Sequence, residues 1–529
     1  MNRKNTVLSG AAVLFAANII VKLTGVAFKI PVQRLIGDTG MGYFNVAYNI
    51  YIWFYLICTS GLPVAVSVCV SRALAEGRED VCAKIFRVSA LSFSSAGAVF
   101  TAVMMIFCKN LSSLSGIDNS YLCIASIAPS VLAACISSSV RGYYQGHGIM
   151  WVTAVSQVIE SAGKAVFGVL FAYISARSGN ALYVTSAYAI FGITAGTLLS
   201  ALFCITVKSF YKRTGKYKCK DKVIGNILKT ALPVTLSSSV MNLSSLADVF
   251  ITPSKLMAIG YTESQAAEIF GNYSTLCLSF ANLPAAFIYP LTSAALPAIS
   301  YARAANDSER ANGLAYNTLK TALFISLPCA VGLGVLSYQA LSVVFPASSS
   351  ALAAPMLTAL SPSVVFCALL AVTDMLLQAN GKPAYPVISM LFGSAVKILS
   401  LFLLFGISYI GRLAIPVGTC LCYLTALLFN IKFCGKDFKI RSLPELIMKP
   451  AFCSALCGIF AYAICGYLSG RISGIPLSAV SILSTGAVYV IAVCLSGYIK
   501  PKTVLKGIIK IKTKDNKNGG ISEKREVRL

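Results

Sequence analysis

The chain alternates long apolar stretches with short polar connections over nearly its whole length. Fourteen of the stretches are long enough to cross a bilayer core, which takes about 20 residues in a helix. Backbone groups in lipid must be hydrogen-bonded within their own segment, so we expect helices. The expected spans are residues 6–33, 42–70, 86–108, 119–140, 149–175, 182–206, 226–250, 269–294, 317–340, 353–378, 384–406, 411–431, 448–468 and 474–498.

The composition agrees with this pattern. Hydrophobic residues make up 57% of the chain and charged residues only 12%, too little charge for a soluble protein of this size. The sequence therefore predicts an all-α polytopic membrane protein with about fourteen transmembrane helices.

The basic residues indicate the orientation. With the N-terminus in the cytoplasm, 34 of the 44 Lys and Arg residues fall on the cytoplasmic side and six fall outside. This asymmetry is what the positive-inside rule predicts, so we expect both termini in the cytoplasm. The net charge of +26 then reflects topology and attraction to anionic lipid head groups. We expect no nucleic-acid partner, because the basic residues lie in short loops beside the spans.

The two halves of the chain resemble each other. Residues 145–148 (Gln-Gly-His-Gly) precede span five, and residues 378–381 (Gln-Ala-Asn-Gly) precede span eleven, at an offset of 233. The same offset relates Ser156 to Ser389, Lys164 to Lys397 and Arg141 to Asp374. Six spans per half keep both halves in the same orientation, as in transporters whose repeats are related by an axis along the membrane normal.

This repeat predicts the domain organisation. We expect two pseudo-symmetric six-helix lobes followed by two extra helices. The expected segments are an N-lobe at 1–207, a basic cytoplasmic linker at 208–225, a C-lobe at 226–432, two further spans at 447–498 and a basic cytoplasmic tail at 499–529.

Span one carries charges at membrane depth. Lys22 and Lys29 are seven residues apart and share one face of a helix, and Arg34 lies near the outer end. An unpaired charge at the bilayer centre costs about 2.5–3.5 kcal/mol. These cations predict the wall of a water-filled cavity that binds an anion. The alternative is a structural ion pair with an acid on another helix.

Other charges inside spans admit two interpretations. Asp248 is placed to pair with Lys22 or Lys29, or with Lys255, either as a gating or ion-coupling residue or as a permanent structural partner. Glu160 and Lys164 have the spacing of a local ion pair on one helix. At the repeat offset, Gly393 takes the place of Glu160. Lys397 consequently lacks a partner on its own helix and joins the predicted cationic cavity.

Helix breakers and aromatic residues add candidate hinges and sugar contacts. Proline and glycine favour kinks, which membrane helices tolerate beside a cavity. The candidate hinge residues are Gly25, Pro31, Gly61, Pro63, Pro290 and Pro297. The aromatic run at 43–55 is typical of an interfacial belt. Asn45 and Asn49 within it are candidate hydrogen-bonding partners for a sugar.

The sequence favours transport over catalysis. The chain has a single histidine and no Cys-x-x-Cys pair, so we expect no metal site and no cofactor. We interpret the 18 cysteines as small apolar side chains in helix packing. No phosphate-binding loop, His-Glu-x-x-His motif or paired aspartates on a loop occur. A membrane-embedded glycosyltransferase would need such acidic loops.

Several motifs carry a family resemblance. They are Leu-Ser-Gly at 8–10, Thr-Gly at 24–25, Leu-Ile-Gly-Asp-Thr-Gly-Met-Gly at 35–42 and Gly-Leu-Pro-Val-Ala-Val-Ser at 61–67. With them the chain resembles the polysaccharide-exporter branch of the multidrug/oligosaccharidyl-lipid/polysaccharide (MOP) superfamily. Its nearest type is the stage V sporulation protein B group, which is related to the lipid II flippase. The resemblance covers essentially the whole chain.

The resemblance implies export of undecaprenyl-pyrophosphate-linked sugars across the bacterial cytoplasmic membrane. It implies a cationic central cavity for the pyrophosphate and a groove for the polyprenyl tail along spans thirteen and fourteen. Lys22 occupies one family cation position. A second falls at Phe28, beside Lys29, and family arginines near Phe54 and Tyr55 have no counterpart here.

The resulting hypothesis is a monomeric flippase for a lipid-linked glycan precursor that works by alternating access. Its partners are the lipid-linked oligosaccharide and membrane lipids. A drug/cation antiporter of the same superfamily is the alternative. An antiporter would place acids and aromatics in the cavity, with Asp248 as the ion-coupling residue.

Overall fold

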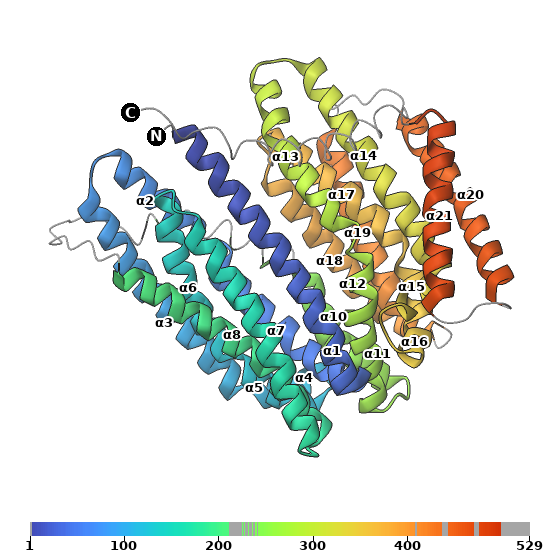
Figure 1. Ribbon diagram of the computed structural model, residues 1–529, viewed down its shortest axis with the longest axis horizontal. Helices are drawn as coiled ribbons and strands as arrows, with labels where there is room; N and C mark the ends of the chain where they lie inside the picture. Colours follow the sequence, from blue (N-terminus) through green and yellow to red (C-terminus); the bar gives the residue numbers. More distant parts are fainter. Residues whose placement is uncertain are drawn as a thin grey trace, which may run out of the picture. The chain divides into compact units, whose positions relative to one another are not determined.

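The computed structural model describes residues 3–210, 242–407, 410–435, 443–469 and 475–498, with isolated positions between 225 and 240. Within these residues the regular structure is helical throughout (Figure 1). The predicted all-α polytopic fold is confirmed.

The helices of the first part of the chain are α1 (Arg3–Thr59), α2 (Leu62–Ala75), α3 (Glu79–Ile106), α4 (Cys108–Ser115), η1 (Asp118–Ser120), α5 (Tyr121–Ile127), α6 (Pro129–Gly146), α7 (Trp151–Arg177) and α8 (Leu182–Phe210). The later helices are α10 (Leu243–Ala258), α11 (Glu263–Asn272), the π-helix η2 (Tyr273–Cys277), α12 (Leu278–Ala281), α13 (Ala285–Ala304), α14 (Ser308–Val335), α15 (Ser337–Ser342), α16 (Ala347–Leu360), α17 (Pro362–Ala379), α18 (Ala384–Phe405), η3 (Gly411–Leu413), α19 (Ala414–Cys434), α20 (Leu443–Ser469) and α21 (Ile475–Leu495).

The helix ends follow local sequence signals. Prolines occupy the first turns of α2, α6 and α17, where the missing N–H has no helical partner to lose. Thr262 and Gln265 form a reciprocal capping box at the start of α11, and the Asp307 side chain caps α14. Each cap satisfies backbone groups that a helix end leaves open.

Twelve helical segments of the described chain are long and apolar enough to cross a membrane. One of them, Ala16–Ala75, includes most of predicted span one and all of span two, and the other eleven correspond to predicted spans three to six and eight to fourteen. Predicted span seven is described only in part, and its last part falls in α10. The protein is therefore a multi-pass membrane protein.

The first two spans form one long helical run with defined interruptions. α1 keeps helical dihedral angles through Gly25 and Pro31 and departs from them at Gly37, with φ 63° and ψ −172°. This positive φ favours glycine. A second interruption lies at Gly61, just before α2, and Pro63 falls in the first turn of that helix. The interruption predicted at Gly25 and Pro31 thus lies about two to three turns later, at Gly37.

Predicted span eight is also interrupted. It begins in the last residues of α11 and continues through the π-helix η2 and the short helix α12, and α13 begins after Pro284. Pro290 and Pro297 lie inside α13. A π-helix in a membrane segment is rare and often accompanies a functional site.

Backbone proximity groups the chain into two compact units. The first contains Met1–Phe280, Val344–Leu360 and Gly381–Phe433, and the second contains Ala281–Val343, Ser361–Asn380 and Cys434–Leu529. The division into lobes at 1–207 and 226–432 remains a prediction.

In the first unit, α7 and α8 pack closely through glycines. A Cβ added at Gly192 would lie 2.2 Å from the Cα of Gly168, and one added at Gly196 would lie 2.4 Å from the backbone N of Lys164. The Gly-x-x-x-Gly spacing of Gly192 and Gly196 is a typical close-packing motif of membrane helices. This contact fixes the position of α7, which carries Glu160 and Lys164.

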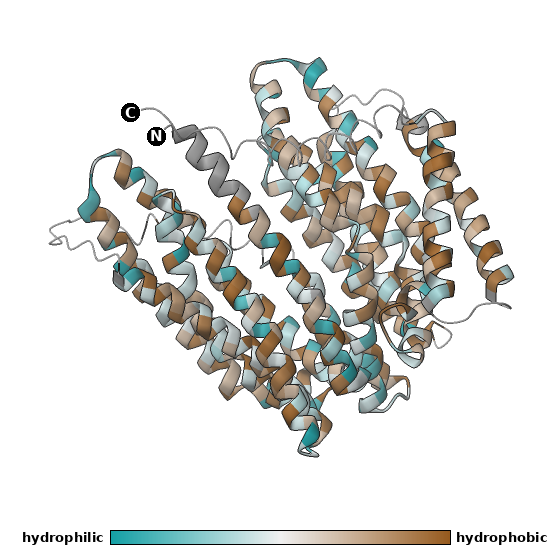
Figure 2. Ribbon diagram, viewed as in Figure 1, coloured by the Kyte–Doolittle hydropathy of each residue, from teal (hydrophilic) through white to brown (hydrophobic). Residues whose placement is uncertain are grey.

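In the second unit, α20 and α21 pack against each other and against α14. The Tyr489 hydroxyl donates to the Phe324 carbonyl oxygen at 3.0 Å. Figure 2 shows mostly hydrophobic residues along α21, and large apolar side chains such as Phe452, Ile459 and Leu483 are exposed on this helix pair. An apolar exposed face of this kind suits contact with lipid.

Candidate functional site

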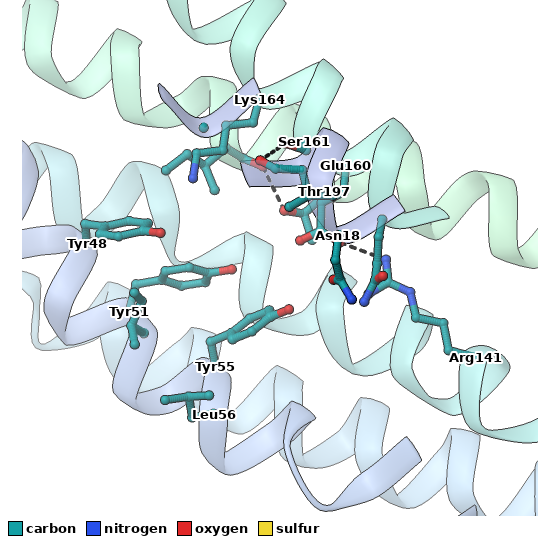
Figure 3. A pocket seen from close by; sticks show the side chains of 15 residues that line it. Asn18, Tyr48, Tyr51, Tyr55, Leu56, Arg141, Glu160, Ser161, Lys164 and Thr197 are labelled. Carbon is teal, nitrogen blue, oxygen red and sulfur yellow. Dashed lines mark hydrogen bonds and ion pairs between the residues drawn. The ribbon is translucent and has the colours of Figure 1, made fainter. Parts of the chain in front are cut away.

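A cavity of about 410 Å³ lies inside the first unit (Figure 3). Four membrane helices line it: α1, α6, α7 and α8. The lining residues are Asn18, Val21, Gly25, Tyr48, Tyr51, Ile52, Tyr55, Leu56, Arg141, Gln157, Glu160, Ser161, Lys164, Ile193 and Thr197. Many of these side chains are polar, which is unusual at membrane depth and typical of a substrate pathway.

Arg141 on α6 is the centre of the polar network. Its Nη2 donates to Glu160 Oε2 at 2.8 Å and to Ser200 Oγ at 2.9 Å, and its Nε donates to Ser156 Oγ at 2.8 Å. The planar guanidinium thereby binds partners on both α7 and α8. Buried cations need such compensation, because a lone buried charge is strongly destabilising.

Glu160 has a different partner from the one predicted. Sequence spacing favoured a pair with Lys164 on the same helix, whereas the structure pairs Glu160 with Arg141. A local pair on an exposed helix contributes only about 0.3–0.5 kcal/mol. A buried guanidinium is stabilised more strongly by a carboxylate partner than an exposed lysine would be. Arg141 directly follows predicted span four and was counted with the cytoplasmic residues, whereas the structure places it inside α6.

Lys164 instead lies over aromatic rings. Its Nζ is 4.9 Å from the Tyr48 ring centroid and 5.6 Å from that of Phe28. These cation–π contacts hold the ammonium at the cavity wall. Lys164, which sequence analysis assigned to a local pair, is a cavity residue.

Three tyrosines of α1 form another wall of the cavity. Tyr48, Tyr51 and Tyr55 follow one helix face, with ring centroids 6.1 Å and 5.4 Å apart in succession. Figure 3 shows their hydroxyl ends directed towards the side of the cavity that carries Glu160 and Asn18. Sequence analysis interpreted this aromatic run as an interfacial belt. Its spacing of three and four residues was the signal for a shared face.

The predicted cations of α1 are arranged differently. Lys22 and Arg34 are exposed, and Lys29 is partly buried, with its Nζ donating to Ser279 Oγ at 2.9 Å. Val21 and Gly25, beside Lys22 on the chain, line the cavity. The three cations share one helix without gathering at a single point of the described structure.

Lys397 is buried in an ion pair. Its Nζ lies 2.7 Å from Asp248 Oδ2 and donates to Ser244 Oγ at 3.0 Å. Lys397 is only 2% exposed. The predicted partners of Asp248, which were Lys22, Lys29 or Lys255, are wrong: its partner is Lys397. Lys255 lies over the Phe402 ring, 4.5 Å from its centroid.

The two candidate sugar contacts each donate a hydrogen bond within the protein. Asn45 is buried, and its Nδ2 donates to Thr275 Oγ1 in η2 at 2.6 Å. Asn49 Nδ2 donates to the Asn45 carbonyl oxygen at 2.9 Å. Both amides therefore have partners within the protein.

Comparison with known proteins identifies the family. Residues 7–303, more than half of the chain, match the family described as polysaccharide biosynthesis protein, and residues 274–403 match the MatE family. Stage V sporulation protein B of Bacillus subtilis (strain 168) is 24% identical over 510 residues, which cover 94% of this chain and 96% of that protein. Lipid II flippase MurJ of the same organism is 24% identical over 483 residues, 85% of this chain and 87% of that protein.

The fold has a matching solved structure. Lipid II flippase MurJ in its inward closed conformation superposes with a TM-score of 0.70 at 17% identity, covering 92% of this chain and 98% of that one. The described helices, the motifs and the family match agree. The chain belongs to the polysaccharide biosynthesis protein family.

Proposed function

We propose that this protein is a flippase that moves an undecaprenyl-pyrophosphate-linked glycan precursor across the bacterial cytoplasmic membrane. The observation that carries the proposal is the cavity, in which Arg141, Glu160, Lys164 and a row of tyrosines meet among membrane helices. Ionisable groups at this depth are expensive and usually mark a transport pathway.

The family relationship narrows the class of substrate. One relative is named as a lipid II flippase and another as a sporulation protein, and the family is named for polysaccharide biosynthesis. A lipid-linked glycan has a polar head group that must be shielded from lipid during crossing. A polar cavity reached by alternating access performs that task without covalent chemistry.

The cations of α1 take the pyrophosphate in this proposal. Lys22 and Arg34 are exposed, and Lys29 has one neutral partner, Ser279. Ammonium and guanidinium groups form strong charge-assisted hydrogen bonds with phosphate oxygens. Lys397 takes a structural role, because Asp248 already neutralises it.

The helix interruptions provide the hinges. Gly37 has a left-handed backbone, Gly61 precedes α2, and Pro284 precedes α13. Such positions absorb backbone rotation when packed helices move as rigid bodies.

The test uses the purified full chain in vesicles that contain a fluorescent undecaprenyl-pyrophosphate-linked sugar. We expect protein-dependent movement of the sugar to the opposite leaflet, measured by its protection from an external quencher. The Lys22→Gln/Lys29→Gln variant should lose this movement. Lys109→Gln, a change of an exposed lysine on α4, serves as the matched control. Normal movement by the double variant would contradict the role of these cations.

A drug/cation antiporter is the second candidate, favoured by the MatE match over residues 274–403. The same vesicles distinguish it. If the vesicles take up a cationic dye in response to an ion gradient and do not move the lipid-linked sugar, the protein is an antiporter and the flippase proposal is wrong.

A further inference from the structure

We propose that the cavity between α1, α6, α7 and α8 is a subsite for one uncharged sugar ring of the lipid-linked glycan, and that the pyrophosphate binds outside it. This inference rests on the proposed flippase function and assigns a chemical class to this cavity.

The charge of the lining argues against a pyrophosphate in the cavity. Among its described residues, Arg141 and Lys164 are the cations and Glu160 is the carboxylate. Arg141 is engaged by Glu160, Ser156 and Ser200, so Lys164 supplies the uncompensated charge. A pyrophosphate brings more than one negative charge and would lie beside the Glu160 carboxylate. Like charges in a partly desolvated site repel strongly.

The neutral polar groups suit a sugar. Tyr48, Tyr51 and Tyr55 present phenol groups, and Asn18 and Gln157 present amides. Sugar hydroxyls both donate and accept hydrogen bonds, and these side chains offer both functions. The intervening tyrosine rings offer apolar surface to the C–H groups of a pyranose.

One residue that lines the cavity has an unsatisfied polar atom. Gln157 Oε1 is buried and has no hydrogen-bond partner among the described residues. Buried polar atoms are nearly always satisfied. Because Gln157 lines the cavity, a small rotation of its amide would let Oε1 accept a hydrogen bond from a ligand there. A sugar hydroxyl can donate this bond, whereas a fully ionised phosphate oxygen can only accept.

The size fits a fragment of the head group. Ligand pockets in proteins span about 300–1,000 Å³, and this cavity of about 410 Å³ lies near the lower limit. It has room for one or two sugar rings. The rest of the head group must then lie outside the cavity, and Lys22, next to the lining residue Val21, is exposed.

The test measures binding of two lipids by the full chain in nanodiscs. The lipids are a short-chain polyprenyl pyrophosphate and the same lipid carrying one N-acetylhexosamine. We expect the sugar to tighten the dissociation constant by about tenfold, the contribution of one or two hydrogen bonds. Tyr51→Phe/Tyr55→Phe should remove most of this gain and leave the affinity for the bare lipid unchanged. Tyr188→Phe, at an exposed tyrosine of α8, is the matched control.

A second variant guards against loss of folding. Gln157→Leu removes the orphan acceptor, so it should keep or raise the unfolding temperature while it reduces the gain from the sugar. Equal affinity of the wild-type protein for both lipids would overturn the inference. So would tyrosine variants that weaken both lipids equally.

The vesicle assay keeps this result separate from the proposed function. If the sugar-dependent gain appears but no lipid moves in vesicles, the flippase proposal fails and the sugar subsite stands. If lipid moves normally but the gain is absent, the subsite fails and the flippase proposal stands.

Discussion

Two ion pairs inside the first unit differ in their access to solvent. Arg141–Glu160 joins α6 to α7 and borders the cavity, with side chains 8% and 22% exposed. Lys397–Asp248 joins α18 to α10, with side chains only 2% and 7% exposed. The first pair is positioned to respond to a ligand, whereas the second is sealed among helices.

The difference can be related to one position of the repeat predicted from the sequence. Lys164 and Lys397 correspond at the offset of 233, but Glu160 corresponds to Gly393. A Cβ at Gly393 would lie 2.6 Å from the Cys422 carbonyl oxygen, so α18 and α19 approach closely there. The glycine lets the helices close over Lys397, and Asp248 on α10 neutralises it.

The sealed pair should give the largest effect when it is broken. Lys397→Met leaves the Asp248 carboxylate buried without its partner, and breaking a buried pair in this way costs about 3–5 kcal/mol. We expect a large fall in the thermal unfolding midpoint of the detergent-solubilised protein. Lys397→Met/Asp248→Asn should recover most of it, because neither charge remains. A stable single variant would show that the pair is not sealed.

The cavity pair should respond more weakly. Glu160→Gln keeps an acceptor oxygen beside Arg141, and water in the cavity offsets part of the lost charge. A hydrogen bond to a charged group contributes about 1.5–3 kcal/mol, and we expect a loss near the lower limit in the same unfolding measurement. Glu309→Gln, at an exposed position of α14, is the control. A loss as large as that of Lys397→Met would remove the distinction between the pairs.

The sequence predicts the membrane helices well because each span must be apolar for its whole length. Interruptions at glycine are harder to place. Gly25 and Gly37 look equally permissive in sequence, yet only Gly37 takes a positive φ. That choice depends on how α1 packs against distant helices.

The partners in an ion pair are even harder to predict from the sequence. Asp248 has three candidate lysines nearby in the predicted topology, and its partner Lys397 is 149 residues away. Glu160 likewise pairs across helices with Arg141 rather than along its own helix. Helix spacing predicts contacts within one helix, whereas these pairs depend on which helices become neighbours.

Substitutions of glycines at close helix contacts should cause a loss of stability of intermediate size. Gly196→Ala would force a Cβ to within 2.4 Å of the Lys164 backbone N, and Gly393→Ala within 2.6 Å of the Cys422 carbonyl oxygen. Overpacking of this kind typically costs about 1–3 kcal/mol, so both variants should unfold at lower temperature. Gly313→Ala in α14, where nothing lies within 4 Å, should be neutral or stabilising. Equal behaviour of all three would mean that close packing does not position α7 and α18.

Lys164 gives the smallest expected effect on stability and the clearest contrast with its counterpart. Lys164→Met loses two cation–π contacts, each contributing about 0.5–1 kcal/mol at an accessible site, and the methionine can still pack against Phe28 and Tyr48. The unfolding midpoint should therefore stay close to that of the wild-type protein. Transport should nevertheless fall by about tenfold or more, because the cavity loses a charged hydrogen-bond donor to the head group.

Lys164→Arg should retain more transport than Lys164→Met, since it keeps the charge and the contact with the rings. Lys397→Met provides the opposite pattern, in which the loss of transport follows the loss of folded protein. The comparison rests on this separation of stability from transport. If Lys164→Met destabilises the protein as much as Lys397→Met, then the two lysines share a structural role and the cavity does not depend on Lys164 for its ligand.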